Sequence, residues 1–343
     1  MTQSRPDTVR LQRISKAFWE SAALMSAVEL GIFTAIARGH NTITSLASEI
    51  GIEALNAERL LTALTAMQLL ERHTTNAAEH NNDTFNNAAD VQRFLVEDSD
   101  AYAGPWMLFG KPRWDGWGDL TARLQITTAE QRRLGMYDDT FTVDRAREYH
   151  QATYSIGMGA ARRFHKQVDL SDRKKLIDIG GGSGCYCITG VQKHANLHAE
   201  VLDLAPVVEV TREFIAHNGV SEQVKASVCD FTADPFPNDA DVAIMASNLP
   251  QYGRQTIQQV VQKVYDALLP GGEFHLIGEM LDPDGCGPLA PALWGLSEAV
   301  NRSTGLAHSE ADCEDYFRQA GFEKITINEF IPETLTRITG IKP

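Results

Sequence analysis

The chain has 343 residues, of which 43% are hydrophobic and 22% charged, a composition typical of globular proteins and a length sufficient for two domains. It has no run of about 18 apolar residues that would predict a transmembrane helix, and its polar N-terminus lacks the apolar core of a signal peptide, so we expect a cytoplasmic protein without a membrane partner. The formal net charge of −14 disfavours a nucleic-acid partner and favours a small-molecule substrate.

The N-terminal third is predicted to be helical. Apolar residues recur at helical spacing over residues 11–36, and two shorter helices follow around Gly51, with Thr44 and Asn56 as their caps. The polar stretch 73–90 is typical of the hairpin that follows a helix-turn-helix pair, so the region resembles a winged helix. A DNA-binding function is nevertheless disfavoured, because Arg59 is the only basic residue of the second helix in that pair.

Residues 101–165 are predicted to form a helical linker rich in aromatic side chains. Trp106, Trp114 and Trp117 stand among proline and glycine residues, which predicts a loop over residues 106–117. Such side chains most often pack in a core, but an aromatic loop can also line a ligand pocket. We expect this segment to line the substrate pocket.

From Lys174 onward, short β-rich runs alternate with helical segments. This alternation predicts an α/β fold with a Rossmann-like, doubly wound and mostly parallel sheet. The expected strands cover residues 174–180, 198–204, 224–230, 241–247, 271–280, 324–330 and 336–343. The five cysteines contain no CxxC pair, so no metal site is predicted, and Cys185 and Cys187 are interpreted as buried apolar groups at the start of a helix.

The first of these strands leads into the sequence Asp-Ile-Gly-Gly-Gly-Ser-Gly, residues 178–184. Glycine lets the backbone turn tightly and approach a ligand, and the amides of the following helix can bind a carboxylate. Dinucleotide-binding proteins use a similar loop. Asp203 after the second strand and Asp230 after the third suit a ribose and an adenine amino group, although either residue alone can be a helix cap or a turn residue.

With these motifs, residues 174–343 resemble the class I S-adenosylmethionine (SAM)-dependent methyltransferases. The whole chain is similar to the dimeric small-molecule O-methyltransferases, in which a winged-helix-like domain forms the dimer. The resemblance implies SAM as the cofactor and a homodimer in which Trp19 reaches the partner. It also implies a dimerisation domain at residues 1–100, the linker at 101–165 and the catalytic domain at 166–343. It implies cofactor-binding roles for Asp178, Gly180, Gly182, Asp203, Leu204, Asp230, Phe231 and Ser247.

The chain departs from that family where the catalytic histidine is expected. Pro250 stands at the position of the histidine, and Ala307 at the position of one of the two carboxylates that orient it, whereas Glu279 matches the other. A hydroxyl with a pKa near 10 is a poor nucleophile without a base, but a thioether sulfur needs no deprotonation. We therefore expect no general base and a thioether acceptor. In this the chain resembles the bacterial S-methyltransferases that act on 4-methylthio-2-hydroxybutyrate in dimethylsulfoniopropionate synthesis.

Aromatic faces would stabilise a sulfonium product, and an arginine would bind a substrate carboxylate. The candidate acceptor-binding residues are Trp106, Arg113, Trp114, Gln251, Tyr252, Trp294 and His308. Two alternatives stay open. One is an O-methyltransferase of an aromatic or polyketide metabolite whose base has moved, for example to His308 or His150. The other is an enzyme that binds SAM but transfers no methyl group.

Overall fold

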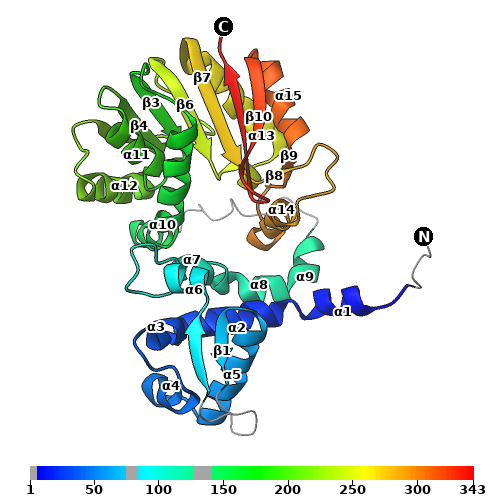
Figure 1. The fold of residues 1–343 in the computed structure, drawn as a ribbon. Helices are drawn as coiled ribbons and strands as arrows, with labels where there is room; N and C mark the ends of the chain where they lie inside the picture. Colours follow the sequence, from blue (N-terminus) through cyan, green and yellow to red (C-terminus); the bar gives the residue numbers. More distant parts are fainter. Residues whose placement is uncertain (1–5, 75–82, 127–140) are drawn as a thin grey trace. The chain divides into compact units, whose positions relative to one another are not determined.

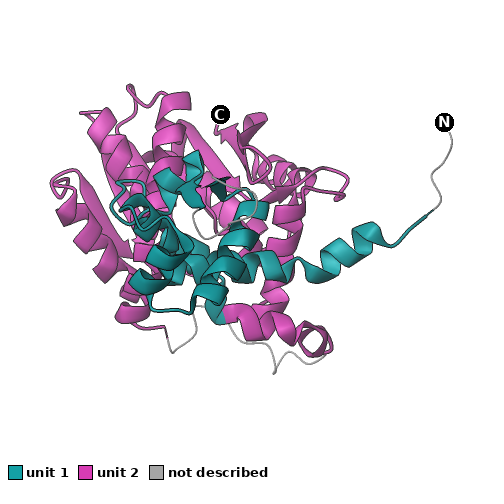
Figure 2. Ribbon diagram, turned by 60° about the horizontal axis from the view of Figure 1, so that its bottom comes forward, with its two compact units in different colours: residues 1–112 teal, residues 113–343 magenta. Residues whose placement is uncertain are grey.

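The computed structural model describes residues 6–74, 83–126 and 141–343 (Figure 1). The chain divides into two compact units, Met1–Pro112 and Arg113–Pro343 (Figure 2). The three-part division with boundaries at residues 100 and 165 stays a prediction. None of the helices in the described ranges combines the length and the apolar character needed to cross a membrane.

The first unit is helical with one hairpin, as the winged-helix resemblance predicts. The antiparallel strands β1 and β2 form the hairpin, and Phe33, Leu61 and Phe85 are fully buried in the core. The elements are α1 Val9–Lys16, α2 Phe18–Glu29, α3 Ile32–Ala37, α4 Ile43–Ile50, α5 Ala54–Ala66, β1 Leu70–His73, β2 Thr84–Asn87, α6 Ala89–Phe94 and α7 Gly104–Leu108.

The predicted caps of α4 and α5 are wrong. Thr42, two residues before the predicted cap, begins α4 in a reciprocal capping box with Ser45. Glu53 precedes α5 without a side-chain cap. Thr44 and Asn56 instead lie inside the helices, because the apolar face that each helix buries sets where it starts.

The loop predicted over residues 106–117 is instead a series of short helices. These are α7, the 3₁₀ turn Lys111–Arg113 and α8 Trp114–Gly118, followed by α9 Leu120–Leu124. Pro105 stands in the first turn of α7, where a missing N–H removes no helical hydrogen bond, so proline starts this helix rather than preventing it. The long helix α10 Val143–Gln167 follows in the second unit.

The second unit contains a seven-stranded sheet in the order β10-β11-β7-β6-β3-β4-β5. The strands β3 to β7 pair in parallel, and β10 and β11 add an antiparallel edge. This arrangement confirms the predicted doubly wound α/β fold. The strands are β3 Lys175–Ile179, β4 His198–Asp203, β5 Val224–Val228, β6 Ala240–Ala246, β7 Leu268–Gly278, β10 Glu323–Ile331 and β11 Leu335–Ile341.

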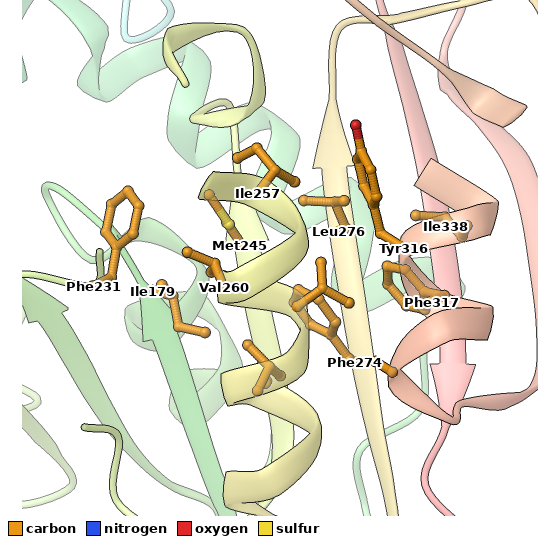
Figure 3. Close-up of a cluster of buried hydrophobic side chains, with 14 of the residues drawn as sticks. Ile179, Phe231, Met245, Ile257, Val260, Phe274, Leu276, Tyr316, Phe317 and Ile338 are labelled. Atoms are coloured by element: carbon orange, nitrogen blue, oxygen red, sulfur yellow. The ribbon is translucent and has the colours of Figure 1, made fainter. Parts of the chain in front are cut away.

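Helices cover both faces of this sheet, as strands buried on both sides require. On one face α10, α11 Cys185–Lys193 and α12 Ala205–His217 pack against Leu176 and Ile277. On the other, α13 Arg254–Ala267 and α15 Glu310–Ala320 pack against residues such as Phe274, which stacks on Phe317 with ring centroids 5.0 Å apart (Figure 3). Cys185 and Cys187 are buried at the start of α11, as predicted.

Two elements near the carboxyl ends of the strands were not predicted. A short parallel pair, β8 Met280–Leu281 with β9 His308–Ser309, joins the end of β7 to the start of α15. The helix α14 Leu289–Asn301 lies in the chain between these two strands and packs against α8 and α9. Within the second unit, α14 also contacts the 3₁₀ turn Leu249–Gln251, so Trp294 and Gln251 come from neighbouring elements.

Candidate active site

The glycine-rich segment 180–184 connects β3 to α11 at the carboxyl edge of the sheet. Gly180, Gly182 and Gly184 have φ angles of +62°, +56° and +74°, which residues with a side chain rarely adopt. The segment lies where β3 separates β4 from β6 and the strand order reverses, the place where doubly wound sheets bind their ligands. Both its conformation and its position are those of a ligand-binding loop.

Side chains crowd this loop closely. A Cβ atom added to Gly180 would lie 2.7 Å from Nδ2 of Asn248, and one added to Gly182 would lie 2.6 Å from Cε1 of His150. Neither distance is tolerated in a real structure, so glycine is required for space as well as for backbone angle. The loop is therefore surrounded by polar side chains from α10 and from the segment after β6.

Asp178, near the end of β3, is completely buried beside the loop. A Cβ atom on Gly181 would lie 2.5 Å from its carboxyl carbon. Burial, together with the nearby Asp203, raises the pKa of Asp178 to about 7. Its Oδ1 atom has no hydrogen-bond partner in the described part of the chain. A buried acceptor without a partner is rare in proteins, and the ammonium group of a ligand would satisfy it.

Asp203 ends β4 and turns its carboxylate back toward the glycine loop. Its Oδ2 accepts a hydrogen bond from the Gly182 amide at 2.9 Å, and its Oδ1 accepts one from the Leu204 amide at 2.7 Å. Burial raises the pKa of Asp203 to about 6, although these two bonds oppose the shift. Each oxygen keeps a second lone pair, so the carboxylate can still accept hydroxyl groups such as those of a ribose.

Asp230 and Phe231 follow β5, which ends at Val228, so Asp230 lies two residues beyond the strand. Its Oδ1 accepts hydrogen bonds from the amide and the hydroxyl of Thr232 at 2.9 and 2.6 Å. The buried ring of Phe231 reaches Gly180, where an added Cβ would lie 3.0 Å from it, and contacts Tyr252 edge-on with ring centroids 5.0 Å apart. An apolar wall thus stands beside the glycine loop.

The segment 247–252 leaves β6 next to the loop. Ser247 is exposed and has a φ angle of +59°, a backbone conformation that is uncommon for serine. Asn248 is buried, and its Nδ2 donates to the carbonyl oxygens of Gly180 and Ala246, each at 3.1 Å. Pro250 is buried in the 3₁₀ turn Leu249–Gln251 and has no group that accepts a proton. A buried packing residue, Pro250, thus occupies the position where the histidine is expected.

Glu279 directly follows β7 at the same edge. It is buried, and its Oε2 has no hydrogen-bond partner in the described ranges. Burial raises its pKa to about 7. Gly278, the residue before it, lies against the segment 247–252, since a Cβ atom there would lie 3.0 Å from Cβ of Leu249. This carboxyl therefore gains and loses its proton near physiological pH, beside the segment that lacks the histidine.

The interpretation of His308 as an acceptor-binding residue or a relocated base is wrong. Its side chain is fully buried, its Nδ1 lies 3.0 Å from the Tyr316 hydroxyl, and its Nε2 lies 2.9 Å from the Tyr252 carbonyl oxygen. Both ring nitrogens are thus occupied, and burial lowers its pKa. His308 instead anchors the 247–252 segment to β9 and α15.

The remaining candidate acceptor residues fall in two units. Trp106 belongs to the first, where it stacks on Phe109 with ring centroids 5.0 Å apart. The others lie in the second unit and are half-buried: Arg113, Trp114, Gln251, Tyr252 and Trp294.

Within the second unit, Tyr252 and Arg113 both interact electrostatically with Glu298, a residue of α14. Burial raises the pKa of Tyr252, and the carboxylates of Asp203, Asp230 and Glu298 add to this shift; the turn that precedes Tyr252 contacts α14. Arg113 is near Glu298, whose pKa burial raises and the guanidinium lowers. Arg113 therefore already faces a carboxylate of the protein.

Sequence reasoning missed one site residue and undervalued two others. Asn248 stands beside the predicted Ser247, but nothing in its identity signals that it bonds to the glycine loop. His150 was considered only as a base, and Glu279 only as the remnant of an absent pair. Among the described residues no three His, Cys, Asp or Glu side chains gather as metal ligands.

Comparison with known proteins defines the class. A model of the O-methyltransferase domain matches residues 117–323, and one of the O-methyltransferase dimerisation domain matches residues 12–97. The chain is 28% identical to 3-hydroxy-5-methyl-1-naphthoate 3-O-methyltransferase of Streptomyces sahachiroi over 97% of its length and 94% of the relative's. It is 26% identical to the tetracenomycin polyketide synthesis 8-O-methyl transferase TcmO of Streptomyces glaucescens, over 96% of both chains.

The fold agrees with these matches. The structure of human N-acetylserotonin methyltransferase in complex with SAM superposes with a TM-score of 0.82 at 21% identity, over 100% of this chain and 99% of that one. The protein is a class I SAM-dependent methyltransferase that acts on a small molecule, and SAM is its cofactor. The chain belongs to the O-methyltransferase family with an N-terminal dimerisation domain.

Proposed function

We propose that this enzyme methylates a hydroxyl group of an aromatic or polyketide-derived metabolite. The observation that carries the proposal is the full-length similarity to enzymes named for methylation of a naphthoate and of a tetracenomycin polyketide intermediate. These names favour the hydroxyl reaction over the thioether reaction that the missing histidine first indicates.

SAM supplies an electrophilic methyl group when bound. The residues proposed to hold it fit such a ligand, because Asp178 offers an unused acceptor and the glycine loop has no room for side chains. Asp203 and Leu204 would contact the ribose, and Asp230 with Phe231 the adenine. The full proposed set is Asp178, Gly180, Gly182, Asp203, Leu204, Asp230, Phe231 and Ser247.

A phenolic hydroxyl has a pKa of about 10 and needs a proton acceptor to react well near neutral pH. Glu279 is the group we assign to this role. Among the described residues its Oε2 has no partner, its pKa of about 7 suits a base near neutral pH, and the preceding Gly278 lies against Leu249, next to the Pro250 that replaces the family's histidine. His308 is excluded, because both of its ring nitrogens are already bonded.

The acceptor itself would lie against aromatic side chains. Tyr252 and Phe231 form a contiguous aromatic wall near the glycine loop, and planar rings bind well to such walls. Trp106, Trp114, Gln251 and Trp294 stay in the proposed acceptor set, with Arg113 as the candidate for a substrate carboxylate.

A thioether acceptor is the second candidate, and Pro250 is the observation that favours it. A thioether has a free lone pair, so alignment of the two sulfur atoms would suffice and Glu279 would have no chemical role. 4-Methylthio-2-hydroxybutyrate is the acceptor that this alternative predicts.

Parallel turnover assays separate these possibilities. The purified enzyme is incubated with SAM and either a hydroxynaphthoate or 4-methylthio-2-hydroxybutyrate, and formation of S-adenosylhomocysteine and methylated product is measured by mass spectrometry. We expect methyl transfer to the hydroxynaphthoate alone. Turnover of the thioether alone would overturn the proposal, and conversion of an acceptor without S-adenosylhomocysteine would show an enzyme that binds SAM but does not methylate.

We also propose a homodimer formed through the N-terminal unit. The helix α1 buries none of its residues, and apolar side chains there and at the start of α2 are 56–69% exposed: Val9, Leu11, Ile14, Phe18 and Trp19. Apolar surface of this extent marks an interface, and the match to the dimerisation domain supports it. Light scattering of an L11D/I14D variant is expected to give the monomer mass.

A further inference from the structure

His150 is a buried imidazole on α10. Its side chain is 6% exposed, and its Nε2 atom has no hydrogen-bond partner in the described ranges. Tyr149 contacts the ring edge-on with centroids 4.9 Å apart. Unpartnered ring nitrogens also occur on His165, His194 and His275, but the one on His150 lies beside the glycine loop, within reach of a ligand bound there.

The ring lies directly against the glycine loop. A Cβ atom on Gly182 would lie 2.6 Å from its Cε1 and 2.9 Å from its Nδ1. Any ligand that approaches the backbone of Gly182 therefore also approaches His150. Burial lowers the pKa of His150 to about 4, so the ring is neutral at physiological pH and offers one N–H donor.

The loop thus has an unpartnered group on each of two adjacent residues. Within the part of the chain that the structure describes, the unused Oδ1 of Asp178 would lie 2.9 Å from a Cβ atom on Gly181, and the unused Nε2 of His150 would lie 3.6 Å from one on Gly182. The amino-acid end of SAM carries an ammonium group, which needs an acceptor, and a carboxylate, which needs a donor. The two unpartnered groups are complementary to these two charges.

We propose that His150 donates a hydrogen bond from Nε2 to the methionine carboxylate of the bound cofactor, while Asp178 accepts one from its ammonium group. His150 is then a cofactor-positioning residue rather than a proton acceptor in the reaction. The inference depends on SAM as the cofactor and not on the acceptor, so it stands or falls independently of the proposed hydroxyl methylation.

The test measures binding rather than turnover. Dissociation constants of S-adenosylhomocysteine and of its decarboxylated analogue are determined by titration calorimetry for wild type, H150M and H150Q. Methionine has about the size of histidine but no donor, whereas the glutamine amide places a donor near the position of Nε2. A hydrogen bond to a charged group is worth about 10- to 100-fold in affinity.

We expect H150M to weaken S-adenosylhomocysteine binding by about 10- to 100-fold and H150Q by less than about threefold, while neither changes binding of the decarboxylated analogue by more than about twofold. H165Q is the matched control, since His165 is buried further along α10 with its Nε2 bonded to the Tyr186 carbonyl oxygen, and it should leave both affinities unchanged.

Two results would overturn the inference. Equal losses for both ligands in H150M would mean that His150 only supports the shape of the loop. Unchanged affinities together with a lower kcat and a lost acid limb in its pH profile would make His150 the base. Thermal unfolding of each variant shows whether it is folded. If H150M is unstable, the H150Q variant, which keeps the donor, still allows the affinities for the two ligands to be compared with those of wild type.

Discussion

Two stretches of the same sheet edge differ in how their polar groups are used. Around the glycine loop, Asp178 and His150 each keep an atom without a hydrogen-bond partner in the described ranges, and Gly180, Gly181 and Gly182 leave no room for side chains of their own. Around the segment 247–252, His308 and Asn248 use their polar atoms within the protein, and Pro250 fills the place of the expected histidine. Glu279 is the exception on that side, because its Oε2 has no partner in the described ranges.

This difference separates groups that hold the fold from groups that await a ligand. A histidine with both nitrogens bonded is a structural residue even when its position in the sequence suggests catalysis. A buried carboxyl with an unused oxygen costs stability, and proteins retain such groups mainly where they act. Asp178, His150 and Glu279 combine such an atom with a position at the carboxyl edge of the sheet, where the cofactor and the acceptor are expected to bind.

The largest effect is expected from E279Q. If Glu279 takes the acceptor proton, kcat falls by about 10²- to 10⁴-fold. In the wild type, kcat should fall about tenfold per pH unit below pH 7, since the pKa of Glu279 is about 7 and only its ionised form is a base. Steady-state rates from pH 5 to 9 check both points. An unchanged kcat in E279Q would favour the thioether acceptor.

The same variant is expected to be more stable than wild type at alkaline pH. The pKa of Glu279 rises from 4.5 to about 7 on folding, so the folded state binds the proton more tightly. The favourable contribution of the Glu279 proton to folding stability is therefore present at low pH and lost as the pH rises through 7. At pH 8, E279Q should raise the free energy of unfolding by about 3 kcal/mol, with no gain at pH 4. Urea unfolding at both values measures this and shows that the variant folds.

A change of His308 should act on stability and leave the acid limb of kcat in place. H308A removes two buried hydrogen bonds and should lower the free energy of unfolding by about 2 kcal/mol. Y316F removes one of these bonds and should cost about 1 kcal/mol. Urea unfolding at pH 7 and a pH–rate profile test this expectation. Disappearance of the acid limb in H308A, with E279Q still active, would reverse the roles assigned to the two residues.

The smallest effect is expected from the pH dependence of cofactor binding. Because the pKa of Asp178 is about 7, its carboxylate is mostly protonated at pH 6 and mostly ionised at pH 8. The affinity for S-adenosylhomocysteine should therefore rise about tenfold over this range if the ammonium pairs with Asp178. In D178N the affinity should be about tenfold lower at pH 8 and independent of pH. A rise that persists in D178N would assign the titration to another group.

The sequence alone determined the fold class and placed the candidate cofactor-binding residues at one edge of the sheet. Alternating strands and helices, a glycine loop after a buried strand, and acidic residues after the next two strands are local signals, and parallel strands bring their carboxyl ends to one edge whatever the details of packing. The hairpin of the first unit was equally local. The short helices at residues 104–118 could not be predicted from local signals, because their proline and glycine residues are compatible with helix starts as well as with loops.

Only the tertiary structure decided what the histidines and Glu279 do. The role of an imidazole depends on which atoms reach its two nitrogens, and for His308 these come from Tyr252 and Tyr316, at separations of 56 and 8 residues. His150 meets the glycine loop across 32 residues of chain, counted from 150 to 182. Such contacts between distant segments are set by the packing of helices on the sheet. Burial and hydrogen bonding together determine the pKa of a side chain, and both exist only after that packing has formed.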